Sequence, residues 1–190
     1  MRREKAAGPL ESYTPLPLPA EPRFYAYLTA EFRQLRLVLD GLVNSRLPGS
    51  VYIKRITPPL RQFLIERGVT VLSAPPKLED AVAEASLIVH HGGIATTMAA
   101  LGMGRVQALW PHVTDQTVTA QGIEALRVGE IAARGVKTAA DAATGLRRLA
   151  DDREMARNAQ TLAAQLAQRH PGGSLKLVLE KARALLAGKS

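Results

Sequence analysis

The chain has 190 residues, 46% of them hydrophobic and 22% charged, which is enough apolar side chain for a sizeable core. It has no cysteine, so disulfides, cysteine-based zinc sites and thiol catalysis are excluded. The 25 lysines and arginines outnumber the 17 acidic residues, and the net charge of +8 favours anionic ligands. No apolar run reaches the roughly 18 residues of a membrane-spanning helix, and no signal peptide is visible, so we expect a cytoplasmic protein.

The first 22 residues carry prolines at positions 9, 15, 17, 19 and 22. Proline has no amide hydrogen and a fixed φ, so this density excludes a helix or a central strand. We therefore predict that residues 1–22 form an extended, proline-rich linker and that residues 23–190 form one domain.

From Arg23 onward, short apolar runs alternate with segments of helical periodicity. The runs are continuously apolar, which is typical of parallel strands covered on both faces. The predicted strands are residues 24–28, 51–53, 69–72, 87–89, 106–110 and 130–133. The predicted helices are residues 31–43, one opening at Pro58, 78–85, 95–101, 116–126, 138–149, 153–168 and one after Ser174. This order predicts an α/β fold with a doubly wound, mainly parallel, six-stranded sheet and C-terminal helices.

The fourth strand leads into two histidines and two glycines, at positions 90–93, and then into a helix. In open α/β sheets, ligands bind at the carboxyl ends of the strands, near the point where the strand order reverses. Glycines let the backbone approach a ligand, and the free amides of a first helical turn favour an anion. His91 is a better ligand candidate than His90, which continues the strand and points to the other face. The alternative is a tight turn in which both histidines merely end the strand.

A second polar loop, His112-Val113-Thr114-Asp115-Gln116, follows the fifth strand. Because neighbouring parallel strands end at the same edge, this loop lies beside the glycine loop. The carboxylate of Asp115 and the amide of Gln116 offer the acceptors and donor that the hydroxyls of a sugar require. The alternative is that this pair only caps the following helix.

Together the two loops resemble the donor-binding signature of UDP-glycosyltransferase-like enzymes, the GT-B glycosyltransferases of the glucuronosyltransferase and macrolide-glycosyltransferase type. The resemblance rests on Val89 to Thr97, Ala100-Leu101, Trp110-Pro111 and Asp115-Gln116. It extends from Arg23 to Leu186 and covers the C-terminal half of such an enzyme. It implies that residues 23–190 are a Rossmann-like domain that binds a nucleotide-sugar donor.

The resemblance also implies a role for individual residues. The diphosphate would be held by His91, Gly92, Gly93 and Thr96, the donor sugar by Asp115 and Gln116, and the base by Ser73, Ala74 and Pro75. The family usually has small residues where this chain has Ile94 and Ala95, so Ile94 is expected to narrow the pocket or alter the choice of donor.

The activity implied is transfer of a hexosyl group from a nucleotide-diphosphate sugar, with a UDP-sugar as the expected donor. No metal or other cofactor is expected, because hydrogen bonds and a helix N-terminus stabilise the leaving diphosphate. The family carries its catalytic base in the N-terminal half, so no residue here is assigned as the base. The expected partner is a separate acceptor-binding domain or subunit, and the basic surface also allows peripheral contact with the inner membrane.

Two alternatives stay open from the sequence. One is a nucleotide-sugar-binding subunit without activity of its own. The other is a basic α/β module for nucleic acid, although the basic residues are scattered and are not interleaved with aromatic ones, so nucleic acid is not the expected ligand.

Overall fold

The computed structural model describes residues 13–169, in which six strands form one sheet. The strands are β1 (Phe24–Thr29), β2 (Gly49–Lys54), β3 (Thr70–Val71), β4 (Leu87–His90), β5 (Val106–Leu109) and β6 (Gly129–Ile131). Every neighbouring pair is parallel, and the order is β3-β2-β1-β4-β5-β6. The predicted doubly wound sheet is thus confirmed. Its order reverses between β1 and β4, which places the switch point at the carboxyl ends of these two strands.

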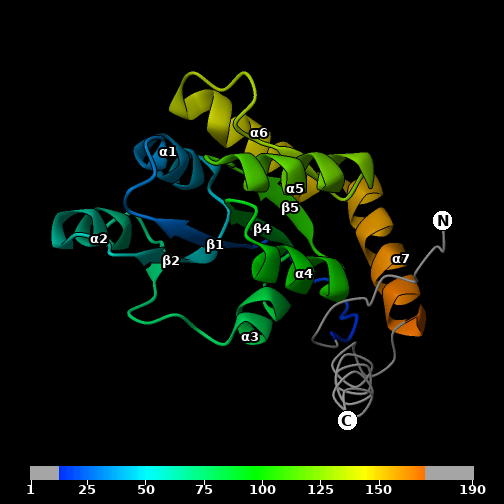
Figure 1. Ribbon diagram of the computed structural model, residues 1–190. Helices are drawn as coiled ribbons and strands as arrows, with labels where there is room; N and C mark the ends of the chain where they lie inside the picture. Colours follow the sequence, from blue (N-terminus) through cyan, green and yellow to red (C-terminus); the bar gives the residue numbers. More distant parts are fainter. Residues whose placement is uncertain (1–12, 170–190) are drawn as a thin grey trace, which may run out of the picture.

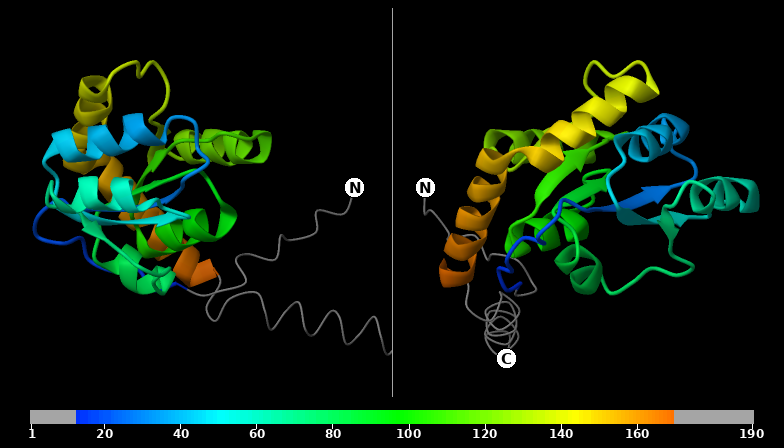
Figure 2. Two further views of the ribbon diagram at one scale, coloured as in Figure 1. Left: turned by 90° about the vertical axis from the view of Figure 1, so that its left-hand side faces the viewer. Right: turned by 180° about the vertical axis from the view of Figure 1, so that it is seen from behind.

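Seven helices lie within the described residues. They are α1 (Leu35–Ser45), α2 (Pro58–Ile65), α3 (Leu78–Ala83), α4 (Ile94–Met103), α5 (Thr114–Ala125), α6 (Ala139–Asp151) and α7 (Arg153–Arg169). Figure 1 shows α1 and α6 on one side of the sheet and α3 and α4 on the other, and Figure 2 shows α7 continuing from α6 down the side of the domain. None of the helices in residues 13–169 is long and apolar enough to cross a bilayer. The helix predicted after Ser174 lies outside the described residues.

The side chains of β1 alternate between two apolar cores. Phe24 and Leu28 pack with the residues of α1 and α6, whereas Tyr25 belongs to the core beneath α3 and α4. All four residues of β4 are buried, because the central strand is covered on both faces. The continuous apolar runs of the sequence are explained by this double covering.

Two helices, α1 and α5, begin two or more residues away from their predicted starts. α1 begins at Leu35 instead of residue 31, because two turns precede it, in which Phe32 N donates to Thr29 O (3.2 Å) and Leu35 N donates to Phe32 O (3.0 Å). α5 begins at Thr114 with Val113 as its N-cap, so Asp115 lies in the first turn of the helix and does not precede it.

Residues 13–22 contain no helix or strand, as their prolines predict, but they are held against the domain. Arg105, which is fully buried, donates to Leu16 O (2.9 Å) and Pro17 O (3.1 Å), and Gln160 Nε2 also donates to Leu16 O (3.1 Å). Tyr13 lies so close to Gly102 that a Cβ there would stand 2.5 Å from the Tyr13 Cβ. This part of the predicted linker therefore has a fixed path over α4 and α7.

Candidate functional site

The glycine loop lies at the switch point and leads directly into α4. Gly93 is the N-cap of α4 and provides no side-chain cap, and the first backbone hydrogen bond of the helix runs from Thr97 N to Gly93 O (3.0 Å). In the described part of the chain, the amides of Ile94, Ala95 and Thr96 have no hydrogen-bond partner. A Cβ placed at Gly93 would meet nothing within 4 Å. Three free amides thus open onto an accessible surface, which is the geometry that binds an anion.

The glycine loop also lies against the loop after β5. Gly92 has a φ of +96°, and a Cβ there would stand 3.0 Å from Gln116 O. The two loops that the sequence placed at one edge therefore touch each other. The N-terminus of α5 is also without a side-chain cap, so this edge of the sheet carries the uncapped N-termini of both α4 and α5 (Figure 1).

His90 ends β4 and points into the core beneath α4, with 1% of its surface exposed. Its Nδ1 accepts a hydrogen bond from Gly92 N (3.1 Å), and its Nε2 lies 3.0 Å from Gln107 Oε1. Because Nδ1 is an acceptor, Nε2 carries the proton and donates to Gln107. His90 thus shapes the glycine loop from below and is not available to a ligand.

His91 joins the ends of three strands. Its Nδ1 donates to Trp110 O (2.9 Å), beyond β5, and its Nε2 accepts from Thr29 N (3.2 Å), at the end of β1. Its ring is 9% exposed and packs edge-on against Phe32, with the ring centres 4.7 Å apart. Both ring nitrogens are therefore occupied. The predicted contact of His91 with a diphosphate would require Nε2 to release the amide of Thr29.

Burial makes both histidines resist protonation. Desolvation lowers the pKa of His90 to about 4. Desolvation also lowers the pKa of His91, and the nearby His112 lowers it further. Both rings are accordingly neutral near pH 7, and neither brings a positive charge to the glycine loop.

These lowered pKa values predict that the protein loses stability in mild acid. Between the folded pKa of His90, about 4, and its ordinary value of 6.5, the unfolded chain binds more protons than the folded one. The contribution of neutral His90 to the free energy of unfolding should be greatest above pH 6.5. It should fall by about 3 kcal/mol as the pH drops to the folded pKa of His90. Urea denaturation at a series of pH values measures this change. A His90→Gln variant should show a smaller slope, and a wild type with constant stability between about pH 7 and pH 5 would contradict the assignment.

The two threonines of α4 differ in their availability. The Thr97 hydroxyl donates to Gly93 O (3.0 Å), so it is used within the first turn of the helix. The Thr96 hydroxyl has no hydrogen-bond partner in residues 13–169, and its oxygen is not among the fully enclosed unpaired atoms. Thr96 is 8% exposed, and of the two hydroxyls its own is the one without a partner in this part of the chain. Its assignment to the diphosphate stays a prediction.

The remaining predicted site residues are accessible. Asp115 is exposed in the first turn of α5 and its carboxylate has no partner in the described chain, while Gln116 is half-buried and its Oε1 accepts from His112 N (3.1 Å). Ser73, Ala74 and Pro75 are exposed in the loop after β3. Since β3 is at the edge of the sheet, beyond β2 and β1, this loop is separated from the glycine loop by two strands. Ile94, at the first position of α4, is 69% exposed.

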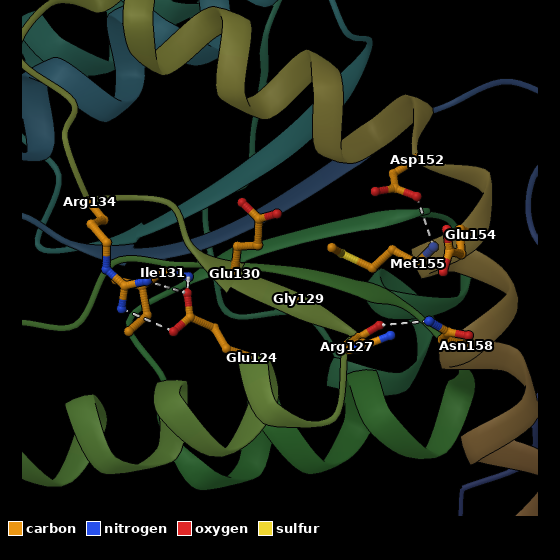
Figure 3. A pocket seen from close by; sticks show the side chains of 10 residues that line it. All are labelled: Glu124, Arg127, Gly129, Glu130, Ile131, Arg134, Asp152, Glu154, Met155 and Asn158. Carbon is orange, nitrogen blue, oxygen red and sulfur yellow. Dashed lines mark hydrogen bonds and ion pairs between the residues drawn. The ribbon is translucent and has the colours of Figure 1, made fainter.

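A hollow of about 520 Å³ lies elsewhere, along the outer side of β6 between α5 and the start of α7 (Figure 3). None of the predicted site residues lines it. Two of its four acidic side chains are in ion pairs, since Glu124 binds Arg134 and Glu130 binds Arg148. Its acidic lining residues outnumber the basic ones, Arg127 and Arg134, so the hollow does not favour an anionic ligand.

Sequence reasoning missed Gln107 and the special position of His112. Gln107 is fully buried, and the signal for it was a polar residue inside an apolar strand. His112 lies in the second loop, where its ring centre is 4.6 Å from that of His91 and 5.5 Å from that of Phe32. No pattern in the sequence shows that these three rings meet.

The sheet order and the uncapped helix at the switch point define a doubly wound domain of the nucleotide-binding class. A family model described as the erythromycin biosynthesis protein CIII-like, C-terminal domain, matches residues 69–177, more than half of the chain. The chain belongs to this family. The match confirms the resemblance to C-terminal halves of glycosyltransferases that the two loops indicated.

Individual relatives agree with this assignment. The L-demethylnoviosyl transferase of Streptomyces niveus is 35% identical over 94 residues, which are 50% of this chain and 24% of that protein. Among solved structures, the spinosyn forosaminyltransferase SpnP has a TM-score of 0.70 at 22% identity, over 94% of this chain and 48% of its own. The glycosyltransferase VinC in complex with dTDP has a TM-score of 0.66 at 20% identity, over 89% and 44%. The chain thus spans about half the length of these solved structures, and its matched part covers about a quarter of the curated relative.

Proposed function

We propose that this chain is the donor-binding part of a glycosyltransferase that moves a hexosyl group from a nucleoside-diphosphate sugar, without a metal ion, to an acceptor held elsewhere. One observation carries the proposal: the three free amides of α4 open at the switch point behind Gly93, where a ligand can approach. Family membership and the net charge of +8 support it. The alternative of a nucleic-acid module gains no support from the family match.

The chemistry follows from the placement of these groups. When the bond between the sugar and the diphosphate breaks, negative charge grows on the leaving oxygen. Preorganised amides at a helix N-terminus stabilise that charge without having to reorient, and the Thr96 hydroxyl adds a further donor. Asp115 and Gln116 are assigned to hydroxyls of the sugar, and Ser73, Ala74 and Pro75 to the base. The base that deprotonates the acceptor is expected outside these residues.

Calorimetry with UDP, TDP and the corresponding sugar nucleotides tests the proposal. We expect one of the two nucleoside diphosphates to bind at least about tenfold more tightly than inorganic pyrophosphate. Thr96→Ala should weaken the binding of both the diphosphate and the sugar nucleotide, because both carry phosphate. Asp115→Asn should weaken only the sugar nucleotide, because its carboxylate is assigned to the sugar.

A matched control is Glu84→Gln, which removes an exposed carboxylate at the end of α3. This residue lies at the amino end of β4, away from the glycine loop at its carboxyl end. It should leave both affinities unchanged. The proposal fails if neither nucleotide binds better than pyrophosphate. Salt-dependent binding of unrelated DNA that Thr96→Ala does not affect would favour the nucleic-acid alternative instead.

A further inference from the structure

Three histidines meet at the proposed donor site, and two of them have no free ring nitrogen. His90 is bonded to Gly92 N and Gln107 Oε1, and His91 to Trp110 O and Thr29 N. Both rings are buried, and each would have to break a hydrogen bond to reach a ligand. With these bonds in place, neither ring offers a free N–H to a phosphate oxygen.

His112 is different. It is exposed, and neither of its ring nitrogens has a hydrogen-bond partner among residues 13–169. Its ring nevertheless has a defined place, because it contacts His91 nearly at right angles (82°), with centres 4.6 Å apart, and also contacts Phe32. Its backbone amide is fixed by Gln116 Oε1 at 3.1 Å. An imidazole held on one side and open on the other is already oriented for a ligand.

The position of His112 places it between the groups assigned to the ligand. It comes two residues before the first turn of α5, whose Gln116 touches Gly92. Its contact with Phe32 and His91 shows that the ring leans from the end of β5 toward the end of β1, across the switch point. The acidic side chain in the loop after β1, Glu31, accepts from Thr29 Oγ1 and pairs with Arg55, so its charge is compensated.

We propose that His112 donates a ring N–H to the diphosphate of the donor, a role that rests on the proposed function. His112 then adds an imidazole donor beside His91, whose ring holds the ends of β1 and β5 together. Hydrogen bonds to a charged group contribute more than those between neutral groups, which gives the removal of His112 a measurable effect.

The test compares His112→Ala with His112→Gln in the full chain, using the nucleoside diphosphate that the wild type binds more tightly. We expect His112→Ala to lower its affinity about tenfold, and the affinity for inorganic pyrophosphate to fall in parallel. His112→Gln should recover most of the loss, because the glutamine Nε2–H lies near the position of the imidazole Nε2–H. In the wild type, the imidazole ¹⁵N resonances of His112 should shift when the nucleotide is added.

Val113→Ala is the matched control, since it truncates an exposed neighbour in the same loop and should leave affinity unchanged. Wild-type affinity in His112→Ala, or His112 resonances that nucleotide does not move, would overturn the role of His112 alone. Equal losses in the alanine and glutamine variants, together with a loss of stability in both, would show a structural role and overturn it too. A wild type that binds neither UDP nor TDP would overturn the proposed function, and this role with it.

Discussion

Replacing Arg105 by methionine should lower the free energy of unfolding by about 3–5 kcal/mol. The Arg105 side chain is fully buried and has no carboxylate partner among residues 13–169. Instead its guanidinium donates to four backbone carbonyls, two of them Leu16 O and Pro17 O. The other two, Val82 O and Ala83 O, both at 3.1 Å, lie at the end of α3.

The last carbonyls of a helix have no partner within it, and they carry the negative end of its dipole. They stabilise the buried charge of Arg105, and Arg105 in turn satisfies them. Methionine has a similar length but no donor. Leu16 O would keep its bond from Gln160 and Val82 O its bond from Ala85 N, whereas Pro17 O and Ala83 O would lose their partner, at a cost of about 1–3 kcal/mol each. Burial lowers the pKa of Arg105, but its guanidinium stays charged at any pH at which the protein would be studied.

Urea denaturation measures the change, with Arg147→Met as the control. Arg147 forms an exposed ion pair with Asp151, one helical turn away, and this pair contributes about half a kcal/mol at most. Arg105→Lys should be intermediate, because one ammonium group cannot reach all four carbonyls. If both methionine variants lost the same small amount of stability, the buried hydrogen bonds of Arg105 would contribute no more than an exposed ion pair does.

The second large effect is expected at Gly92, where alanine should weaken nucleotide binding at least about tenfold. The φ of +96° is strained for any residue with a side chain, and the added Cβ would press against Gln116 O at 3.0 Å. The loop would have to move away from α5, and the amides at the start of α4 would move with it. Calorimetry with the nucleoside diphosphate measures the loss.

Two other glycines separate the possible causes. Gly68 has a φ of +78° with nothing near its Cβ position, so Gly68→Ala should cost similar backbone strain but leave binding intact. Gly93 has a φ of −63° and open space, so Gly93→Ala should leave stability intact and reduce binding only if the ligand passes over it. Equal binding losses in the Gly68 and Gly92 variants would mean that strain alone explains the effect.

Much of the fold was predictable because the strands are apolar over their whole length and the helices are periodic. The contact between the two site loops also follows from topology, since neighbouring parallel strands end at one edge. The predicted start of α1 was wrong because Phe32 continues the helical spacing of apolar residues although it lies in a turn. Spacing alone does not distinguish a residue that packs from the helix from one that packs just before it.

The partners of His91 could not be predicted. They are backbone groups of Thr29 and Trp110, 62 and 19 residues away, and backbone groups leave no trace in a sequence pattern. Arg105 is similar, because its contact with Leu16 spans 89 residues and a lone arginine after a helix resembles a surface residue. The assignment of His91 to the diphosphate stays a prediction, which requires its Nε2 to release the amide of Thr29.

The pairing of His90 with Gln107 has a consequence for how these positions can change over evolutionary time. An apolar residue at either position alone would leave a buried polar group of the other without a partner, which costs more than losing both together. His90 Nδ1 also accepts a hydrogen bond from Gly92 N, so a substitution of Gln107 that moves the His90 ring would also move the glycine loop. Positions 90 and 107 should therefore vary as a pair among related proteins, and a lineage in which they have changed should also differ in the residues that follow, at 92 to 94.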